Sequence, residues 1–194
     1  MPATSAEART DPDARGFAAS FGTLLELADR RPVGFTARLR AGGGGRSGTA
    51  GRWLLGETCR RAAATGELGA IGAPPDQLGA PGFVEDVSAA VAEAELDPAG
   101  LLLAVPEPTL AEDVPATRRR LCAVKDLGVQ LAVDGFGTGY TRLAHLRRFP
   151  IDALMVDRAV LDALSRAPAS ASLLQALVRL GRDLGLHVLA SGEQ

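Results

Sequence analysis

Short apolar segments alternate along the chain with longer amphipathic segments, beginning near Phe17. The apolar segments predict strands over residues 22–25, 33–39, 68–71, 101–105, 129–133, 153–156 and 187–190. The amphipathic segments predict helices over residues 51–65, 82–95, 110–127, 141–148 and 170–184. Such repeated alternation indicates an α/β fold in which helices cover a parallel sheet. The segments LLLAV (101–105) and VQLAV (129–133) show no polar alternation, as is typical of strands buried on both faces.

The pattern predicts one domain over residues 17–194, because 194 residues suffice for one substantial core and hardly for two. Residues 1–16 are rich in acidic and small residues and lack the apolar segment of a signal peptide. We expect them to form a disordered tail. The glycine-rich segment 41–51 lacks the Gly-Lys-Ser/Thr ending of a phosphate-binding loop, so we expect a flexible connector there.

Charge and cysteine content narrow the classes of partner. A formal net charge of −2 gives no general field for a nucleic-acid polymer or an anionic membrane. No apolar segment approaches the ~20 residues that span a bilayer. Cys59 and Cys122 lack the spacing of a metal or redox site and are expected to be core residues. These features favour a reduced, cytoplasmic protein.

The strongest functional signal lies between Leu131 and Leu161. A buried strand ends at Asp134, and a glycine-rich loop, an amphipathic helix and a second strand follow. In α/β proteins, ligands bind at the carboxyl ends of parallel strands, which makes Asp134 a candidate site residue. Gly135 follows it, and Met155 stands on the next strand, where a polar group would have been expected.

Five segments, in the same order, resemble those of EAL domains, the cyclic di-GMP phosphodiesterases. DGFGTGYTRLAHLRRFPIDALMVDR resembles the family signature DDFGTGYSSL…LPVDxLKIDR, and PVGFTARLR resembles the VxGxEALLR segment that names the family. GRWLLGETCRRAA, DPAGLLLAVPEPTLAED and LGLHVLASGEQ are similar to GxWVLxxAC, LELEITE and LGxxVVAEGVE. The resemblance implies a modified (βα)8, TIM-like barrel with its site at the carboxyl ends of the strands.

Two departures from the family concern the fold. The family continues with a further strand and helix after the AEGVE segment, whereas this sequence stops at Gln194. The family also has a longer, proline-bearing segment where residues 41–51 stand. The resemblance is therefore to a C-terminally shortened EAL domain, and it implies an incomplete or open barrel. An open edge would be covered by a partner or by the N-terminal segment.

The resemblance also implies which positions held the site in active members. Those members use Mg²⁺ or Mn²⁺, bound by oxygen ligands from several strands, to activate a water. Most matching positions are uncharged here: Gly22, Thr36, Gly72, Ala104, Gly135, Met155 and Ser191 stand for glutamine, glutamate, asparagine, glutamate, aspartate, lysine and glutamate. Of the metal-binding and water-activating set, only Asp134 remains. One carboxylate cannot hold an ion that demands several oxygen ligands, so we expect no metal, no cofactor and no catalytic residue.

Other matching positions keep the family's residues. Glu107 and Phe136 match residues that stabilise the glycine-rich loop, and Arg40 matches an arginine that contacts the dinucleotide. An exposed charge at a strand end explains Arg40 equally well, and a hydrogen-bonded loop cap is the preferred interpretation of Asp134. The candidate ligand-binding residues are Arg40, Asp134, Gly137, Thr138 and Gly139.

We therefore expect a degenerate EAL domain, a pseudoenzyme of bacterial cyclic di-GMP signalling that acts through a protein partner or as a homodimer. The first alternative is a receptor that binds cyclic di-GMP without hydrolysis, through Arg40 and loop amides. A residual metal-dependent phosphodiesterase is less expected. A gene product without present function is the fourth alternative.

Overall fold

The computed structural model describes residues 9–10, 17–40, 48–111, 114–136, 146–156, 161 and 170–191. Its strands are β1 (Arg9–Thr10), β2 (Ala18–Glu26), β3 (Arg31–Arg40), β4 (Leu68–Gly72), β5 (Leu101–Pro106), β6 (Gln130–Phe136), β7 (Ala153–Val156) and β8 (His187–Ser191). Its α-helices are α1 (Gly48–Thr65), α2 (Pro75–Gly79), α3 (Phe83–Glu93), α4 (Val114–Asp126) and α7 (Ser170–Leu184). Two short 3-10 helices, η1 (Pro98–Gly100) and η2 (Glu107–Leu110), flank β5.

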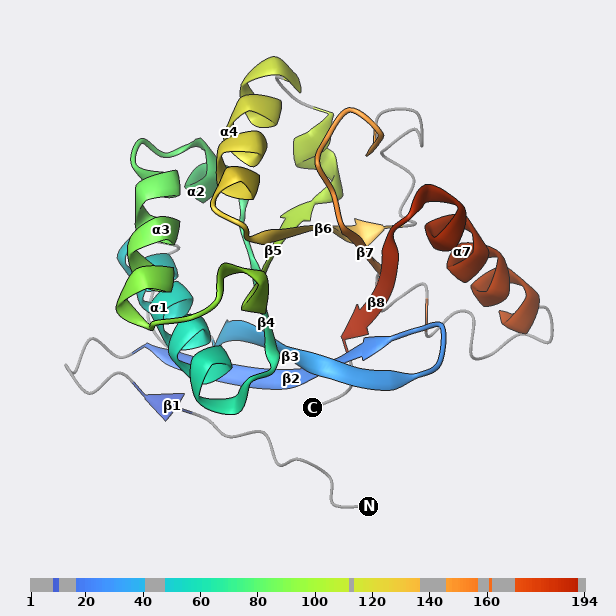
Figure 1. Ribbon diagram of the computed structural model, residues 1–194, viewed down its shortest axis with the longest axis horizontal. Coiled ribbons are helices and arrows are strands. Elements are labelled where there is room, and N and C mark those ends of the chain that lie inside the picture. The colour runs from blue at the N-terminus through green and yellow to red at the C-terminus, as the bar shows by residue number, and fades with distance from the viewer. Residues whose placement is uncertain are drawn as a thin grey trace.

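Strands β2 to β8 form a closed, TIM-like barrel (Figure 1). Strands β3 to β8 pair in chain order and run parallel, and β2 closes the ring by pairing antiparallel with both β3 and β8. The described part of the chain thus contains a seven-stranded form of the expected eight-stranded barrel. Of the two expected forms, the barrel is incomplete in strand number and not open, because the N-terminal segment covers the edge of β8.

The antiparallel direction of β2 follows from its connection to β3. Only four residues, 27–30, join the two strands. A parallel connection needs a crossover of a dozen or more residues, so a turn this short permits only an antiparallel pair. The expected parallel sheet is therefore found for β3 to β8 and not for β2.

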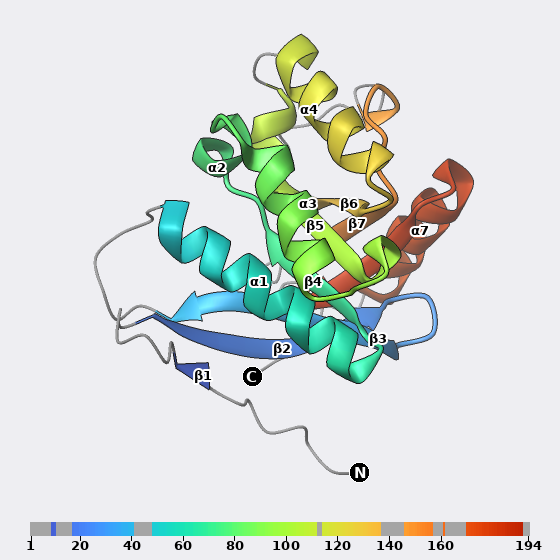
Figure 2. The same cartoon turned by 60° about the vertical axis from the view of Figure 1, so that its left-hand side comes forward.

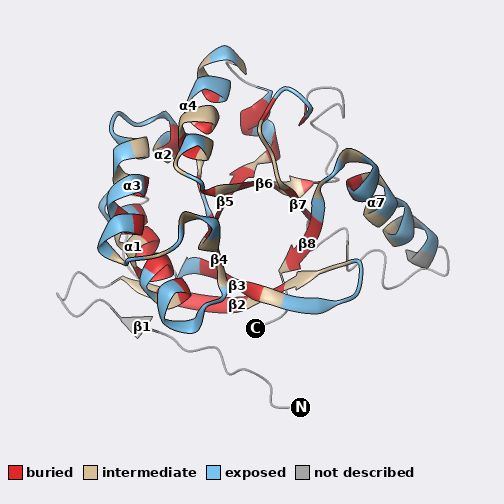
Figure 3. Ribbon diagram, viewed as in Figure 1, coloured by how far each residue is buried: buried red, intermediate tan, exposed pale blue. Residues whose placement is uncertain are grey.

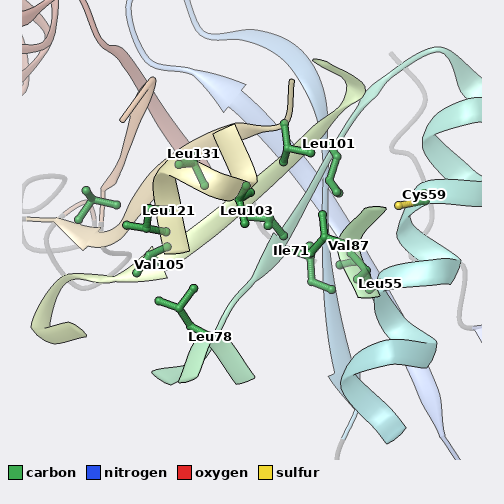
Figure 4. Close-up of a cluster of buried hydrophobic side chains, with 14 of the residues drawn as sticks. Leu55, Cys59, Ile71, Leu78, Val87, Leu101, Leu103, Val105, Leu121 and Leu131 are labelled. Carbon is green, nitrogen blue, oxygen red and sulfur yellow. The ribbon is translucent and has the colours of Figure 1, made fainter. Parts of the chain in front are cut away.

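Two apolar layers line the two faces of the barrel wall. The inner layer fills the barrel and consists of Leu24, Ala70, Leu102, Ala104, Ala132, Ala153, Met155 and Leu189. The outer layer lies between the strands and the helices (Figure 4); its labelled members are Leu55, Cys59, Ile71, Leu78, Val87, Leu101, Leu103, Val105, Leu121 and Leu131. Strands that face both layers must be apolar at every position, as predicted for 101–105, which is buried throughout (Figure 3).

The helices of the described residues pack against the outside of the barrel. Helices α1, α3 and α4 lie next to one another on one side (Figures 1 and 2), and α7 packs beside β8. No helix among the described residues is long and apolar enough to cross a membrane.

The Asp152 carboxylate holds β6 and β7 in register at the end of the barrel where these parallel strands begin. Asp152, just before β7, accepts a hydrogen bond of 2.9 Å from the backbone N–H of Leu131 on β6. Its two oxygens also lie 2.7 and 2.6 Å from the Lys125 ammonium on α4. This register places Asp134 directly beside Met155.

Three predicted segments fall wholly or partly outside the described residues. Most of the predicted helix 141–148 lies there. Of the predicted connector 41–51, residues 41–47 lie there, while α1 begins at Gly48. Within the predicted tail 1–16, Arg9–Thr10 pairs with β2 as β1, and the disorder of the remainder stays a prediction.

Candidate functional site

A cavity of about 690 Å³ opens at the carboxyl ends of the parallel strands. Side chains alternate between the two faces of a strand, so the last inward-facing residue of each strand borders this cavity. The lining residues are Ser20, Thr36, Ala37, Arg38, Leu39, Gly51, Leu54, Ala70, Ile71, Gly72, Pro74, Gln77, Ala104, Asp134, Gly135, Met155, Val156 and Ser191.

The barrel brings most of the degenerate positions predicted from the sequence together in this cavity. Those that line it, each from the C-terminal half of a strand, are Thr36, Gly72, Ala104, Gly135, Met155 and Ser191. The candidate ligand-binding residue Asp134 joins them. The remaining position, Gly22, contributes its backbone, because its carbonyl accepts a hydrogen bond of 3.5 Å from the Thr36 hydroxyl.

Two neutral hydroxyls meet on one wall of the cavity. The Thr36 hydroxyl on β3 lies 3.4 Å from the Ser191 hydroxyl on β8. Thr36 is only 4% exposed, so its hydroxyl is directed at protein groups as well as at the cavity. At the two positions where the resemblance implies glutamates, the barrel therefore has a weak pair of neutral hydrogen-bonding groups.

Asp134 stands where β6 bends. The next residue, Gly135, has φ +75°, and the pairing with β7 shifts between Asp134 and Phe136. A left-handed backbone of this kind favours glycine, since a Cβ would be strained. The left-handed residue Gly135 leaves Asp134 half-buried at the mouth of the barrel, while the glycine-rich loop predicted at residues 137–139 lies outside the described residues.

The described residues of the cavity do not fit a divalent metal. Mg²⁺ and Mn²⁺ require several hard oxygen ligands, usually with negative charge. Asp134 is the one carboxylate among the described lining residues, and no group of three His, Cys, Asp or Glu side chains in the described part of the chain could hold an ion. Met155, 5% exposed, contributes a thioether that packs in the inner apolar layer.

Among the described lining residues, the one cation is Arg38, for which the sequence motifs predicted no role. Arg38 lines the cavity, whereas Arg40, the predicted contact, is an exposed residue at the last position of β3 and does not line it. Arg38 lies two residues after Thr36 and therefore on the same face of β3. That alternation was visible in TARLR and could have identified it.

Two further polar lining residues, Ser20 and Gln77, were also missed. Ser20 pairs with Arg38 across β2 and β3. Gln77 lies on α2, a short helix that the sequence analysis did not predict. Its side-chain amide packs against Gly51 of α1, where a Cβ would collide with it.

The predicted loop-stabilising residues are both buried next to the cavity strands. Glu107 is 1% exposed, in η2 directly after β5, and Phe136 is 7% exposed at the end of β6. Gly137, Thr138 and Gly139 lie outside the described residues, so their part in ligand binding stays a prediction, as does the support of their loop.

Comparison with known proteins places these segments among relatives. The model of the EAL domain matches residues 43–192. The bifunctional diguanylate cyclase/cyclic di-GMP phosphodiesterase MucR of Pseudomonas aeruginosa is 33% identical over 148 residues, which are 73% of this chain and 22% of MucR. The cyclic di-GMP phosphodiesterase NbdA of the same organism is 34% identical over 146 residues, 72% of this chain and 19% of NbdA. The chain thus spans about a fifth of the length of these relatives.

Solved structures extend the likeness to nearly the whole chain. The PaMucR phosphodiesterase in complex with c-di-GMP matches with a TM-score of 0.78 and 26% identity, over 91% of this chain and 81% of that one. The EAL domain of Mycobacterium smegmatis DcpA matches with a TM-score of 0.76 and 25% identity, over 94% of this chain and 90% of that one.

Proposed function

Because this chain belongs to the EAL domain family, we propose that it acts as a non-hydrolysing EAL domain in bacterial cyclic di-GMP signalling. In this proposal it is a cytoplasmic pseudoenzyme that regulates through contacts with a protein partner or a second copy of itself. The observation that carries the proposal is a barrel-end cavity of about 690 Å³ whose described lining side chains are nearly all neutral.

The chemistry of phosphodiester cleavage supports the loss of activity. Hydrolysis at neutral pH needs an activated water and positive charge to stabilise the developing charge on the phosphate. Among the described lining residues Asp134 is the one carboxylate, and a single carboxylate supplies neither a metal site nor a second general acid. Met155 cannot donate a proton or carry a charge, and its neighbour Ala104 offers no polar atom on its side chain.

The signalling context is inferred from relatives. MucR and NbdA are both named for cyclic di-GMP chemistry, and the PaMucR structure holds c-di-GMP. Family membership makes the same ligand or pathway the first candidate for this chain. Neutral residues at the matching positions, in a barrel that is closed, then favour a regulatory role over a catalytic one.

An assay of hydrolysis tests the proposal. Purified chain is incubated with cyclic di-GMP and either Mn²⁺ or Mg²⁺, and the nucleotides are separated by anion-exchange chromatography. We expect no linear dinucleotide above the protein-free blank, while the PaMucR phosphodiesterase serves as positive control. Linear product that disappears in Asp134→Ala would contradict the proposal and establish the residual phosphodiesterase instead. Light scattering of the same sample measures whether a second copy is bound.

A second candidate function, binding of cyclic di-GMP without hydrolysis, is favoured by Arg38. This arginine lines the cavity, and guanidinium groups bind phosphate oxygens in a bidentate manner. The two functions differ in which surface binds: the cavity in a receptor, and a protein-contact surface in an interaction module. A receptor loses its ligand when the cavity is altered, whereas a module that acts through protein contacts keeps its partner.

A further inference from the structure

Arg38 is placed to face the contents of the cavity. It follows Thr36 by two positions on β3, so both side chains project from the inward face of the strand, and both line the cavity. Arg38 is exposed, and within the described residues no hydrogen bond or ion pair occupies its guanidinium. A free guanidinium beside a cavity is available to an anion.

Neutral donors surround this cation at the cavity wall. Ser20 is its cross-strand partner on β2 and lines the cavity with it. Gln77, from α2, lines the same cavity and carries an amide. Hydroxyl and amide groups donate hydrogen bonds to phosphate oxygens without needing a counter-ion. The set of one arginine with neutral donors suits a singly charged phosphodiester better than it suits a metal ion.

We propose that Arg38 binds the phosphate group of an anionic ligand directly in this cavity, without a divalent metal. The inference rests on the second candidate function, and it names the residue and the chemistry of that site. The positive charge that metals supply in active relatives is here carried by the protein, on the strand that holds Thr36. A phosphate of a cyclic dinucleotide and a free phosphate share this chemistry.

Asp134 then has the opposite effect to that of a metal ligand. Its carboxylate lines the cavity and repels a bound phosphate through space. Neutralising it therefore strengthens binding of an anion held by Arg38. If Asp134 instead held a metal that bridged to the ligand, neutralising it would weaken binding. The sign of the change distinguishes the two modes.

Calorimetric titration of the purified chain tests the proposal, with cyclic di-GMP, GMP and inorganic phosphate as separate probes. Each titration is done once in EDTA and once in Mn²⁺. We expect cyclic di-GMP to bind with the same affinity in both buffers. Saturation by inorganic phosphate with the same dependence on Arg38 would identify free phosphate as a source. Absence of binding by all three probes would overturn the inference.

The affinities of substituted proteins show which residues contribute to binding. We expect Arg38→Leu to weaken binding at least ~10-fold, because a hydrogen bond to a charged group is lost, and Arg38→Lys to restore part of it. Arg31→Leu, an equal loss of charge at the opposite end of β3, is the matched control and should change affinity less than ~2-fold. Asp134→Asn should raise affinity ~2- to 5-fold. Circular dichroism confirms that each variant is folded.

Two results would contradict this inference without touching the non-hydrolysing proposal: a strict requirement for Mn²⁺, or unchanged affinity in Arg38→Leu. Conversely, linear product in the Mn²⁺ samples would overturn the non-hydrolysing proposal. The titrations in EDTA would still show whether Arg38 binds the ligand without metal. The two proposals therefore fail independently.

Discussion

At the scale of single residues, Met155 has become part of the core that supports the cavity. It is 5% exposed and packs in the inner layer with Ala104, Ala132 and Leu189. An ammonium at this position would lie among these alkyl groups, and its two neighbours in register would be Asp134 on β6 and Leu189 on β8. We therefore expect a lysine at this position to destabilise the barrel.

We predict that Met155→Lys destabilises the protein by about 2–4 kcal/mol, because burial of an ammonium is compensated only partly by one carboxylate. Met155→Leu, which keeps volume and polarity, should cost less than about 1.5 kcal/mol. Urea unfolding followed by circular dichroism measures both changes. Equal stability of the lysine variant and the wild type would show that the cavity retains a site for the cation.

Some residues of the cavity could be predicted from the sequence and others could not. The degenerate positions from Thr36 to Ser191 were predicted from motifs, and the barrel gathers them in one cavity. Arg38 was missed because it stands where the motif has an apolar residue, so motif matching gave it no role. Strand alternation from Thr36 would have placed it at the cavity. The place of Gln77 at the cavity could not be predicted from the sequence, because it depends on packing between α2 and α1.

At the scale of elements, close approach between α7 and β8 depends on one glycine. A Cβ at Gly181 would collide with the Val188 side chain and lie 3.1 Å from the Leu186 carbonyl oxygen. Helix α7 ends at Leu184, as predicted from the sequence, and the next residue, Gly185, turns the chain with φ +72°. This contact holds α7 against the strand that closes the barrel.

Two glycine-to-alanine changes within helices should therefore have opposite signs. Gly181→Ala should destabilise by about 1–2 kcal/mol, since the steric conflict exceeds the gain in helix propensity. Gly56→Ala in α1 meets only the flexible end of Arg60, at 3.3 Å, and should stabilise by about 0.5–1 kcal/mol. Thermal unfolding of both variants measures the difference, and stabilisation by Gly181→Ala would contradict the packing of α7 on β8.

Strands β2 to β8 were predictable as elements because each contains an apolar segment bounded by polar or glycine residues, whereas the polar β1 lies in the segment predicted as a tail. The direction of β2 was accessible as well, since the gap before β3 is too short for a crossover. The closure of the ring by pairing of β2 with β8 was not accessible from local pattern. That pairing depends on the curvature of the whole sheet, which no short segment records.

At the scale of the whole molecule, the outer apolar layer makes the barrel and helices α1, α3 and α4 one cooperative unit. Cys59 of α1 lies in this layer and is fully buried. Burial raises the pKa of the Cys59 thiol from 9.0 to about 11, partly offset by the positive charge of Arg60. The titration of this thiol therefore depends on whether the molecule is folded.

Stability should consequently fall at high pH. The thiol keeps its proton in the folded state, while in the unfolded state it ionises above pH 9, so rising pH favours unfolding. The stabilisation is complete below pH 9 and is lost between pH 9 and about 11, by about 2 kcal/mol. Urea unfolding of wild type and Cys59→Ala across this range isolates the effect from other titrating groups. Parallel pH profiles for the two proteins would contradict it.

The pairing of β2 with β8 also affects the order in which the barrel folds. Leu24 pairs with Ser191, so strands at opposite ends of the sequence meet, and such distant contacts form late and slowly during folding. During synthesis β2 and β3 leave the ribosome long before β8. The contact between the Thr36 and Ser191 hydroxyls can therefore form only after β8 has been made. The cavity is therefore the last feature of the barrel to be built. Any molecule that occupies it selects chains in which the ring has closed, and its binding energy stabilises that closure.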